Sequence, residues 1–296
     1  MASVQANGIT IEFEEQGTGE PILLVMGLGA QLIDWPQGLV DLIAAEGFRV
    51  IRFDNRDSGL SSEFTSEPPT TAQLAKAVLL RRLLQAEYLL SDMADDAVGL
   101  LGALGIDSAH VVGASMGGMI AQAMAIEHPA RVRSMTSIMS TTGNRRVGQP
   151  TLRLIQKTVR RPVPTRETAA DIGVEAFRDI CGPTFDEDEF RALVQTAVDR
   201  SFRPAGTARQ TAAIIASGDR TAGLERLDVP ALVIHGMLDE LVRPSGGLAT
   251  ARAIPGSRLL MFNDMAHDLP HTRWREMADA IAHNAQRAGR PLSAVV

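Results

Sequence analysis

The sequence has few of the features that mark secreted, metal-binding or membrane-spanning proteins. Cys181 is the only cysteine in 296 residues, which excludes an intramolecular disulfide and a multi-cysteine metal site. No window of eighteen uninterrupted apolar residues occurs, so no membrane span is expected. The N-terminal residues contain neither the basic region nor the apolar region of a secretory signal. The cytoplasm is therefore the expected compartment.

An excess of basic residues is also missing. Lysine and arginine together number 29 against 35 aspartate and glutamate residues, and the net charge of −6 argues against a nucleic-acid partner. The hydrophobic fraction of 45% and the charged fraction of 22% are those of an ordinary globular protein. The length fits one large domain or one domain with an insertion.

Segments typical of strands alternate with segments that are apolar at helical spacing. The predicted strands are residues 9–14, 21–26, 48–53, 109–112, 133–139, 231–234 and 258–262. The predicted helices between and after them are residues 32–45, 88–104, 118–128, 245–253 and 273–287. The first strand alternates apolar and polar residues, which favours an antiparallel strand at the sheet edge, whereas the others are apolar on both faces. This pattern predicts an α/β fold with a mostly parallel sheet between layers of helices.

One stretch interrupts the alternation. Residues 142–227 contain helical patterns, punctuated by prolines, and no convincing strand. The short helices predicted there are residues 151–159, 166–180, 186–200 and 205–217. We therefore expect residues 1–141 and 228–296 to form the core, with 142–227 inserted as a helical cap over the strand ends.

Charges are distributed unevenly in this expected cap. Its early part is rich in basic residues, followed by an acidic run: Arg145, Arg146, Lys157, Arg160, Arg161 and Arg166, then Asp186, Glu187, Asp188 and Glu189. Two interpretations stay open, namely two solvated faces or a rim that attracts an anionic ligand.

Ser115 is the candidate nucleophile. It lies at the centre of Gly113-Ala114-Ser115-Met116-Gly117, between the strand-like run 109–112 and a helix-like stretch. A serine at the apex of a strand–turn–helix presents its hydroxyl to a substrate at the carboxyl end of a sheet strand. Such a turn strains the serine backbone and leaves no room for side chains at the flanking glycines. The motif therefore predicts a nucleophile elbow.

A serine nucleophile needs a base and an orienting carboxylate. His267 follows the strand 258–262 and Asp239 follows the strand 231–234, so both belong to loops at the carboxyl ends of strands, where Ser115 also lies. His271 is the competing base and Glu240 the competing acid. Asp264 and Asp268, which flank the histidine, are expected to be exposed loop charges.

The oxyanion of an acyl-transfer intermediate needs two backbone donors. We expect them to be the N–H of Met116, which follows the nucleophile, and the N–H of Leu28 in the glycine-rich loop after the strand 21–26. The rim of the site would also carry four substrate-binding candidates, Met26, Gly27, Met237 and Met265. Methionine side chains make an apolar and adaptable pocket lining.

These motifs resemble the α/β-hydrolase family along nearly the whole chain. The stretches around Ser115 and His267 are similar to those of serine esterases related to aclacinomycin methylesterase. The resemblance implies an eight-stranded, mostly parallel sheet with flanking helices and a cap. It also identifies residues 52–61 as the family's turn after the fourth strand, which we interpret as a structural loop pinned by Arg and Asp.

Two departures from the family pattern occur. Met26 precedes Gly27 where the family usually has histidine, and Ala266 replaces the usual glycine before the catalytic histidine. Neither removes a catalytic group. Ser115 itself argues against haloalkane dehalogenases and most epoxide hydrolases of this fold, which use aspartate at the elbow.

The expected function is hydrolysis of small-to-medium apolar carboxylic esters through an acyl-enzyme, without a metal or organic cofactor. The same triad could cleave an enol-lactone or a C–C bond β to a carbonyl, or form a peroxyacid, and these alternatives stay open. A third hypothesis is a ligand receptor that retains the fold, against which the intact Ser/Asp/His set argues. The expected partner is a small-molecule ester, with self-association into a homodimer left open.

Overall fold

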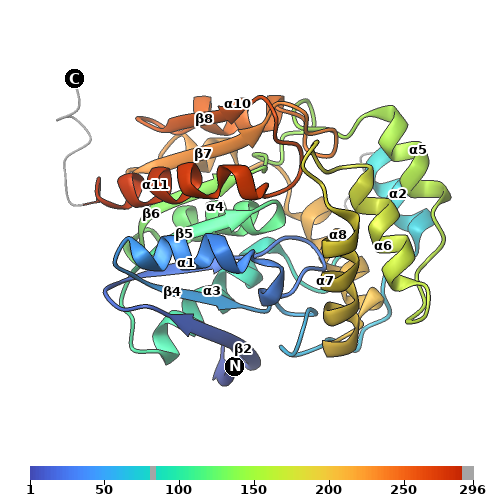
Figure 1. Ribbon diagram of the computed structural model, residues 1–296, viewed down its shortest axis with the longest axis horizontal. Helices are drawn as coiled ribbons and strands as arrows, with labels where there is room; N and C mark the ends of the chain where they lie inside the picture. The colour runs from blue at the N-terminus through green and yellow to red at the C-terminus, as the bar shows by residue number, and fades with distance from the viewer. Residues whose placement is uncertain (81–84, 289–296) are drawn as a thin grey trace.

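The computed structural model describes residues 1–80 and 85–288, in which helices cover both faces of one eight-stranded sheet (Figure 1). The strand order is β1-β2-β4-β3-β5-β6-β7-β8. The strands are β1 (Ala2–Ala6), β2 (Ile9–Gln16), β3 (Glu20–Val25), β4 (Phe48–Phe53), β5 (Ala109–Ala114), β6 (Val132–Ile138), β7 (Ala231–Gly236) and β8 (Arg258–Phe262). The β1–β2 and β2–β4 pairs are antiparallel and all other neighbouring pairs are parallel. The predicted mostly parallel sheet is confirmed.

Two layers of helices bury the sheet. The flanking helices are α1 (Gln37–Ala45), α3 (Leu90–Ala103), α4 (Met116–Glu127), α10 (Ser245–Ala253) and α11 (Trp274–Ala285). In β3, Ile22 and Leu24 pack into the cluster formed with α1 and α11, whereas Leu23 and Val25 pack into the cluster formed with α3 and α4. Successive residues of a strand point to opposite faces, so a strand covered on both sides is apolar at most of its positions. This explains the continuous apolar runs in the sequence.

Residues 142–227, all of them described, form helices between β6 and β7 and contain no strand. We refer to them as the helical segment. Its helices are α5 (Leu152–Arg160), α6 (Ala169–Arg178), α7 (Glu187–Arg200), α8 (Pro204–Ser217) and α9 (Thr221–Leu224). Helices α5 to α8 gather at one side of the sheet, to the right in Figure 1, together with α2 (Thr71–Leu80).

Two predictions about local structure were wrong. The edge of the sheet is β1 rather than β2, because residues 2–6 fold back on β2 through Asn7-Gly8. Both turn residues have positive φ, 48° and 77°, and an Asn-Gly pair accommodates such a hairpin at low cost. The helix predicted over 32–45 is a short 3₁₀ turn at Leu32–Asp34 followed by α1, since Pro36 has no N–H to continue the first helix.

Candidate active site

The turn between β5 and α4 holds Ser115 in a strained conformation. Its φ is 56° and its ψ is −118°, outside the usual regions for a residue with a side chain. A Cβ at Gly113 would lie 2.0 Å from the carbonyl oxygen of Gly117, and a Cβ at Gly117 would lie 1.9 Å from that of Val25. Both glycines are therefore required by the close approach of β5, α4 and β3. The Ser140 hydroxyl, which the sequence did not single out, donates to the carbonyl oxygen of Ser115 at 2.8 Å.

Three side chains from distant parts of the chain meet at this turn. His267 Nε2 lies 3.0 Å from Ser115 Oγ, and His267 Nδ1 lies 2.8 Å from Asp239 Oδ2. The second carboxylate oxygen of Asp239 accepts the backbone N–H groups of Leu241 and Val242 at 2.9 and 2.8 Å. Both distances from the imidazole are hydrogen-bond distances, so a proton can pass from Ser115 to His267 while Asp239 holds the ring.

Asp239 is buried and ionised. Its burial opposes ionisation, but the neighbouring His267 and His235 outweigh that effect and lower the pKa of Asp239 to about 2. His235, on β7, is fully buried, and its Nε2 lies 2.7 Å from the carbonyl oxygen of Val242 and 3.5 Å from Asp239 Oδ2. An ionised carboxylate at this position can accept a hydrogen bond from His267 Nδ1–H and so orient the ring.

The two predicted oxyanion donors, Leu28 and Met116, lie next in the chain to residues that touch or include the nucleophile. Gly27 lies so close to Ser115 that a Cβ on it would be 3.2 Å from Ser115 Cβ and 3.8 Å from Ser115 Oγ. Met116 is the first residue of α4, whose N-terminal N–H groups are free of helical partners. Within the described part of the chain, the N–H groups of Leu28 and Met116 have no hydrogen-bond acceptor. Both N–H groups are thus available as donors, and their role in binding an oxyanion stays a prediction.

The other predicted residues lie at different depths. Met237 is 53% exposed, whereas Met26 and Met265 are buried in the hydrophobic cluster formed with α1 and α11. Their contact with substrate stays a prediction. Of the alternatives, Glu240 accepts hydrogen bonds from Thr151 and Arg153, and His271 is exposed at the turn before α11. The structure thus brings Asp239 and His267, but neither alternative, to Ser115.

One expectation about the histidine loop was wrong. Asp268 is not an exposed charge, because it is half-buried and accepts the N–H groups of Gly182 and Ala266, each at 3.0 Å. Burial raises its pKa. Gly182 belongs to the helical segment, and the N–H of His267 donates to the carbonyl oxygen of Ile180 in the same stretch at 2.9 Å. The helical segment therefore holds the backbone of the His267 loop.

The helical segment also holds the oxyanion loop, through Gln210 of α8. Gln210 is fully buried; its Oε1 accepts the N–H of Gly29 and its Nε2 donates to the carbonyl oxygen of Arg56, both at 2.8 Å. The backbone of Gly29 has φ 68°, and a Cβ there would lie 2.8 Å from Thr207 Oγ1 of α8. No periodic or motif signal in the sequence distinguishes Gln210 from other helical glutamines.

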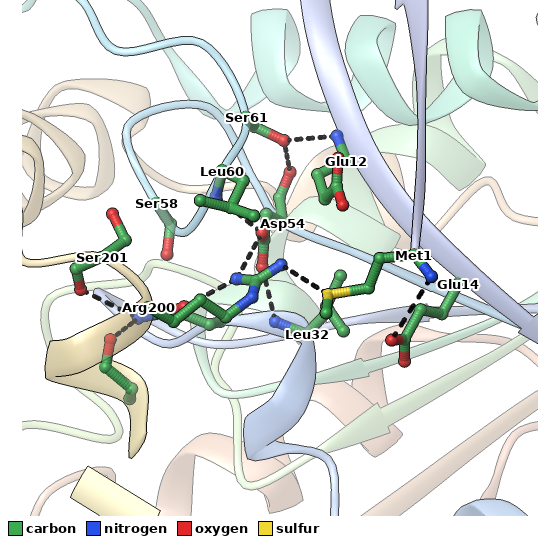
Figure 2. A network of polar contacts seen from close by, with 12 residues as sticks. Met1, Glu12, Glu14, Leu32, Asp54, Ser58, Leu60, Ser61, Arg200 and Ser201 are labelled. Atoms are coloured by element: carbon green, nitrogen blue, oxygen red, sulfur yellow. Dashed lines mark hydrogen bonds and ion pairs between the residues drawn. The ribbon is translucent and has the colours of Figure 1, made fainter. Parts of the chain in front are cut away.

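Buried ion pairs attach the same helices to the turn after β4, which we interpreted from the sequence as a structural loop pinned by Arg and Asp. Asp54 accepts the N–H groups of Leu32 and Leu60 and lies 2.7 Å from Arg200 of α7 (Figure 2). Asp57 pairs with Arg209 of α8 at 2.8 Å, and both side chains are almost completely buried. These contacts join segments about 140 to 150 residues apart in the sequence.

Two further properties concern ligands and membranes. Within residues 1–80 and 85–288, no group of three or more His, Cys, Asp or Glu side chains is arranged to hold a metal ion. None of the helices in that part of the chain combines the length and the apolar character needed to cross a membrane.

Comparisons with known proteins agree with this architecture. The family model described as alpha/beta hydrolase fold matches residues 20–273. The chain is 29% identical to a rhodomycin D methylesterase of Streptomyces sp. strain C5, over 92% of this chain and 94% of that protein. It is 28% identical to a 2-hydroxymuconate semialdehyde hydrolase of Pseudomonas sp. strain CF600, over 88% and 85%. A thermophilic esterase from Thermogutta terrifontis superposes with a TM-score of 0.73 at 25% identity, over 97% of this chain and 99% of that one.

Proposed function

This chain belongs to the α/β-hydrolase family, and we propose that it is a serine carboxylic ester hydrolase acting on small-to-medium apolar esters. The observation that carries the proposal is the relay at the elbow: His267 Nε2 is 3.0 Å from Ser115 Oγ and His267 Nδ1 is 2.8 Å from Asp239. The similarity to a methylesterase and to an esterase supports an ester bond as the target and a small alcohol as the leaving group.

In the proposed mechanism Ser115 Oγ attacks the acyl carbon while His267 Nε2 accepts its proton. The N–H groups of Leu28 and Met116 bind the oxyanion of the tetrahedral intermediate. His267 then protonates the departing alkoxide, and the acyl group stays on Ser115. A water molecule, deprotonated by His267, attacks the acyl carbon; the bond to Ser115 Oγ then breaks, His267 gives its proton back to that oxygen, and the carboxylic acid leaves. Asp239 keeps the imidazole in the tautomer that presents Nε2 to the serine.

We also propose that residues 142–227 act as a cap that completes the site. This proposal is supported by the contacts of Ile180, Gly182 and Gln210 with the loops that carry His267 and Leu28. Met26, Gly27, Met237 and Met265 are the proposed substrate-binding residues, of which Met237 is the most exposed.

The test is to replace Ser115 or His267 with alanine and measure turnover of a p-nitrophenyl ester. Each change is expected to lower kcat by at least ~10⁴ with little change in KM, because the two residues act as one unit. His271→Ala is the matched histidine control and should keep normal turnover, since His271 is exposed and outside the relay. Mass spectrometry after treatment with an alkyl fluorophosphonate should place the adduct on Ser115. Near-normal kcat in either active-site variant would refute the assignment.

A second candidate is hydrolysis of a C–C bond β to a carbonyl by the same residues. The similarity to 2-hydroxymuconate semialdehyde hydrolase, at 28% identity over 88% of the chain, supports it. Turnover of vinylogous diketones with higher kcat/KM than that of simple esters would favour this candidate. Turnover of esters with no action on the diketones would favour the ester hydrolase.

A further inference from the structure

The solvent-facing side of helix α5 is apolar. Leu152, Ile155 and Val159 occupy positions i, i+3 and i+7, which lie on one face of a helix, and they are 78%, 42% and 59% exposed. Val163, just after the helix, is 72% exposed. Leu154 is only 2% exposed and packs toward the protein. We call Leu152, Ile155, Val159 and Val163 the α5 stripe. Single exposed apolar residues are ordinary, whereas four within twelve positions form a surface.

Polar contacts fix the helix in this orientation. At its start, the Thr151 N–H and hydroxyl donate to Glu240, the neighbour of Asp239, at 3.0 and 2.9 Å, and Arg153 pairs with the Glu240 carboxylate at 2.8 Å. At its other end, Lys157 and Arg161 both pair with Asp179 at the end of α6. Rotating α5 to bury its stripe would break these contacts. These polar contacts therefore keep the α5 stripe facing the solvent. Helix α5 itself lies at the outer edge of the molecule (Figure 1).

The surroundings of the stripe are basic. Residues 142–163 contain six basic side chains and no acidic one. Glu240 and Asp179 balance two of these charges, which leaves a local excess of four positive charges in a chain whose net charge is −6. Arg145, Arg146 and Arg160 are exposed, and none forms an ion pair within residues 1–80 and 85–288. These are residues of the basic cluster whose role the sequence left open.

We propose that the α5 stripe and its basic flank dock on an anionic lipid surface. An amphipathic helix with apolar residues on one side and Lys/Arg beside them lies in the plane of a bilayer interface. Its apolar side chains enter the boundary between headgroups and acyl chains, and the arginines attract anionic headgroups. A second copy of this chain fits less well, because a two-fold contact through α5 would place the same positive charges opposite each other.

The docked face is next to the loop of the triad acid. Met237 and Leu238, 53% and 47% exposed, precede Asp239 in that loop and lie within three residues of the Glu240 contact with Thr151. The start of α5 is therefore joined to the loop at the carboxyl end of β7. Docking itself does not depend on the proposed ester hydrolysis.

The experiment is cosedimentation of the full chain with vesicles of phosphatidylcholine mixed with phosphatidylglycerol, and with vesicles of phosphatidylcholine alone. The chain should bind the mixed vesicles, bind the neutral ones much more weakly, and lose affinity as salt is added. Ile155→Gln should lower the affinity for mixed vesicles roughly tenfold, because it removes apolar burial without adding charge. Arg160→Gln should lower it severalfold at low salt and less at high salt.

Leu259→Gln is the matched control. Leu259, on the edge strand β8, is 39% exposed, close to the 42% of Ile155, so its replacement should leave vesicle binding unchanged. Ile155→Gln and Arg160→Gln should keep wild-type turnover of a soluble p-nitrophenyl ester, which shows that both variants fold. No binding to mixed vesicles, equal binding to neutral ones, or wild-type binding by Ile155→Gln would each overturn the proposal. A dimer in sedimentation equilibrium that Ile155→Gln dissociates would assign the stripe to self-association instead, and binding to an acidic polypeptide but to no vesicle would assign it to a protein partner.

Discussion

Replacing Gln210 with leucine is expected to lower kcat through the oxyanion loop, although Gln210 does not reach the reacting atoms. Its amide bridges the Gly29 N–H and the Arg56 carbonyl oxygen, both at 2.8 Å, and its side chain is fully buried. Leucine has a similar volume but can pair with neither group. The loop that carries the proposed donor Leu28 then loses a fixed point one residue away.

The expected fall in kcat can be estimated from the contribution of one oxyanion donor to the activation barrier. Removing an oxyanion donor outright costs about 3–4 kcal/mol, or 10²–10³ in kcat. A donor that is displaced but still present loses part of this, so we expect kcat to fall about 10- to 100-fold with KM changed less than about threefold. Leaving the buried Arg56 carbonyl unpaired also costs about 1–3 kcal/mol of folding stability, whereas Gly29 is exposed and its N–H can bond to water.

The assay must separate positioning from stability. Gln122→Leu is the matched control, because Gln122 is also fully buried and bonds Ser137 and Arg220, but it lies two turns into α4. Both variants should lower the urea midpoint, and only Gln210→Leu should lower kcat and weaken inhibition by an alkylboronic acid, which forms a tetrahedral anion on Ser115. Equal kcat in the two variants, or unchanged boronic acid inhibition in Gln210→Leu, would refute the positioning role.

Three more substitutions test other parts of the site. Asp239→Asn should lower kcat on the order of 10⁴, because an amide at this position favours the wrong imidazole tautomer. Pre-steady-state turnover of a p-nitrophenyl ester measures the loss. A fall in kcat of less than tenfold would contradict the role of Asp239. Arg209→Met should cost about 3–5 kcal/mol in urea unfolding, because it leaves the buried Asp57 carboxylate without its cation; a cost under 1 kcal/mol would show that Asp57 is satisfied by its other donors. Burial raises the pKa of Asp34 to about 6, from 3.8 in the unfolded chain, so its ionisation lowers stability as pH rises from about 4 to 6. Asp34→Asn should then be more stable than wild type at pH 7 by about 1–3 kcal/mol and equally stable near pH 4, whereas a constant difference across that range would refute the assignment.

The fold and the relay could be predicted from the sequence because their signals are local. Strands covered on both faces are apolar at most positions, and this appears directly as the runs in β3, β5 and β7. The nucleophile elbow can be recognised within five residues, since only glycine fits at Gly113 and Gly117. The topology then brings the three catalytic candidates together, because loops after parallel strands meet at one edge of the sheet. Ser115, Asp239 and His267 could therefore be grouped without knowing any distance.

The residues that hold the site in place could not be predicted, because their role depends on distant partners. Asp268 looks like any charged loop residue until the stretch 180–182 covers it and its oxygens accept two backbone N–H groups. Gln210 and Arg209 lie in a helix whose sequence says nothing about the turns after β3 and β4. The strand β1 was missed for a different reason: Ala2–Ala6 is short and weakly patterned, and only the Asn7-Gly8 turn indicates that it folds back.

The attachments of the helical segment decide how a substrate can enter. Detaching α7 and α8 would separate Arg200 from Asp54 and Arg209 from Asp57, and it would withdraw Gln210 from Gly29. On detachment the two ions of each pair would be hydrated separately, and Gln210 would exchange its two protein partners for water. Because a detached state would lack the support that Gln210 gives to the proposed oxyanion loop, we expect productive binding to occur with α7 and α8 in place, as one wall of the proposed site.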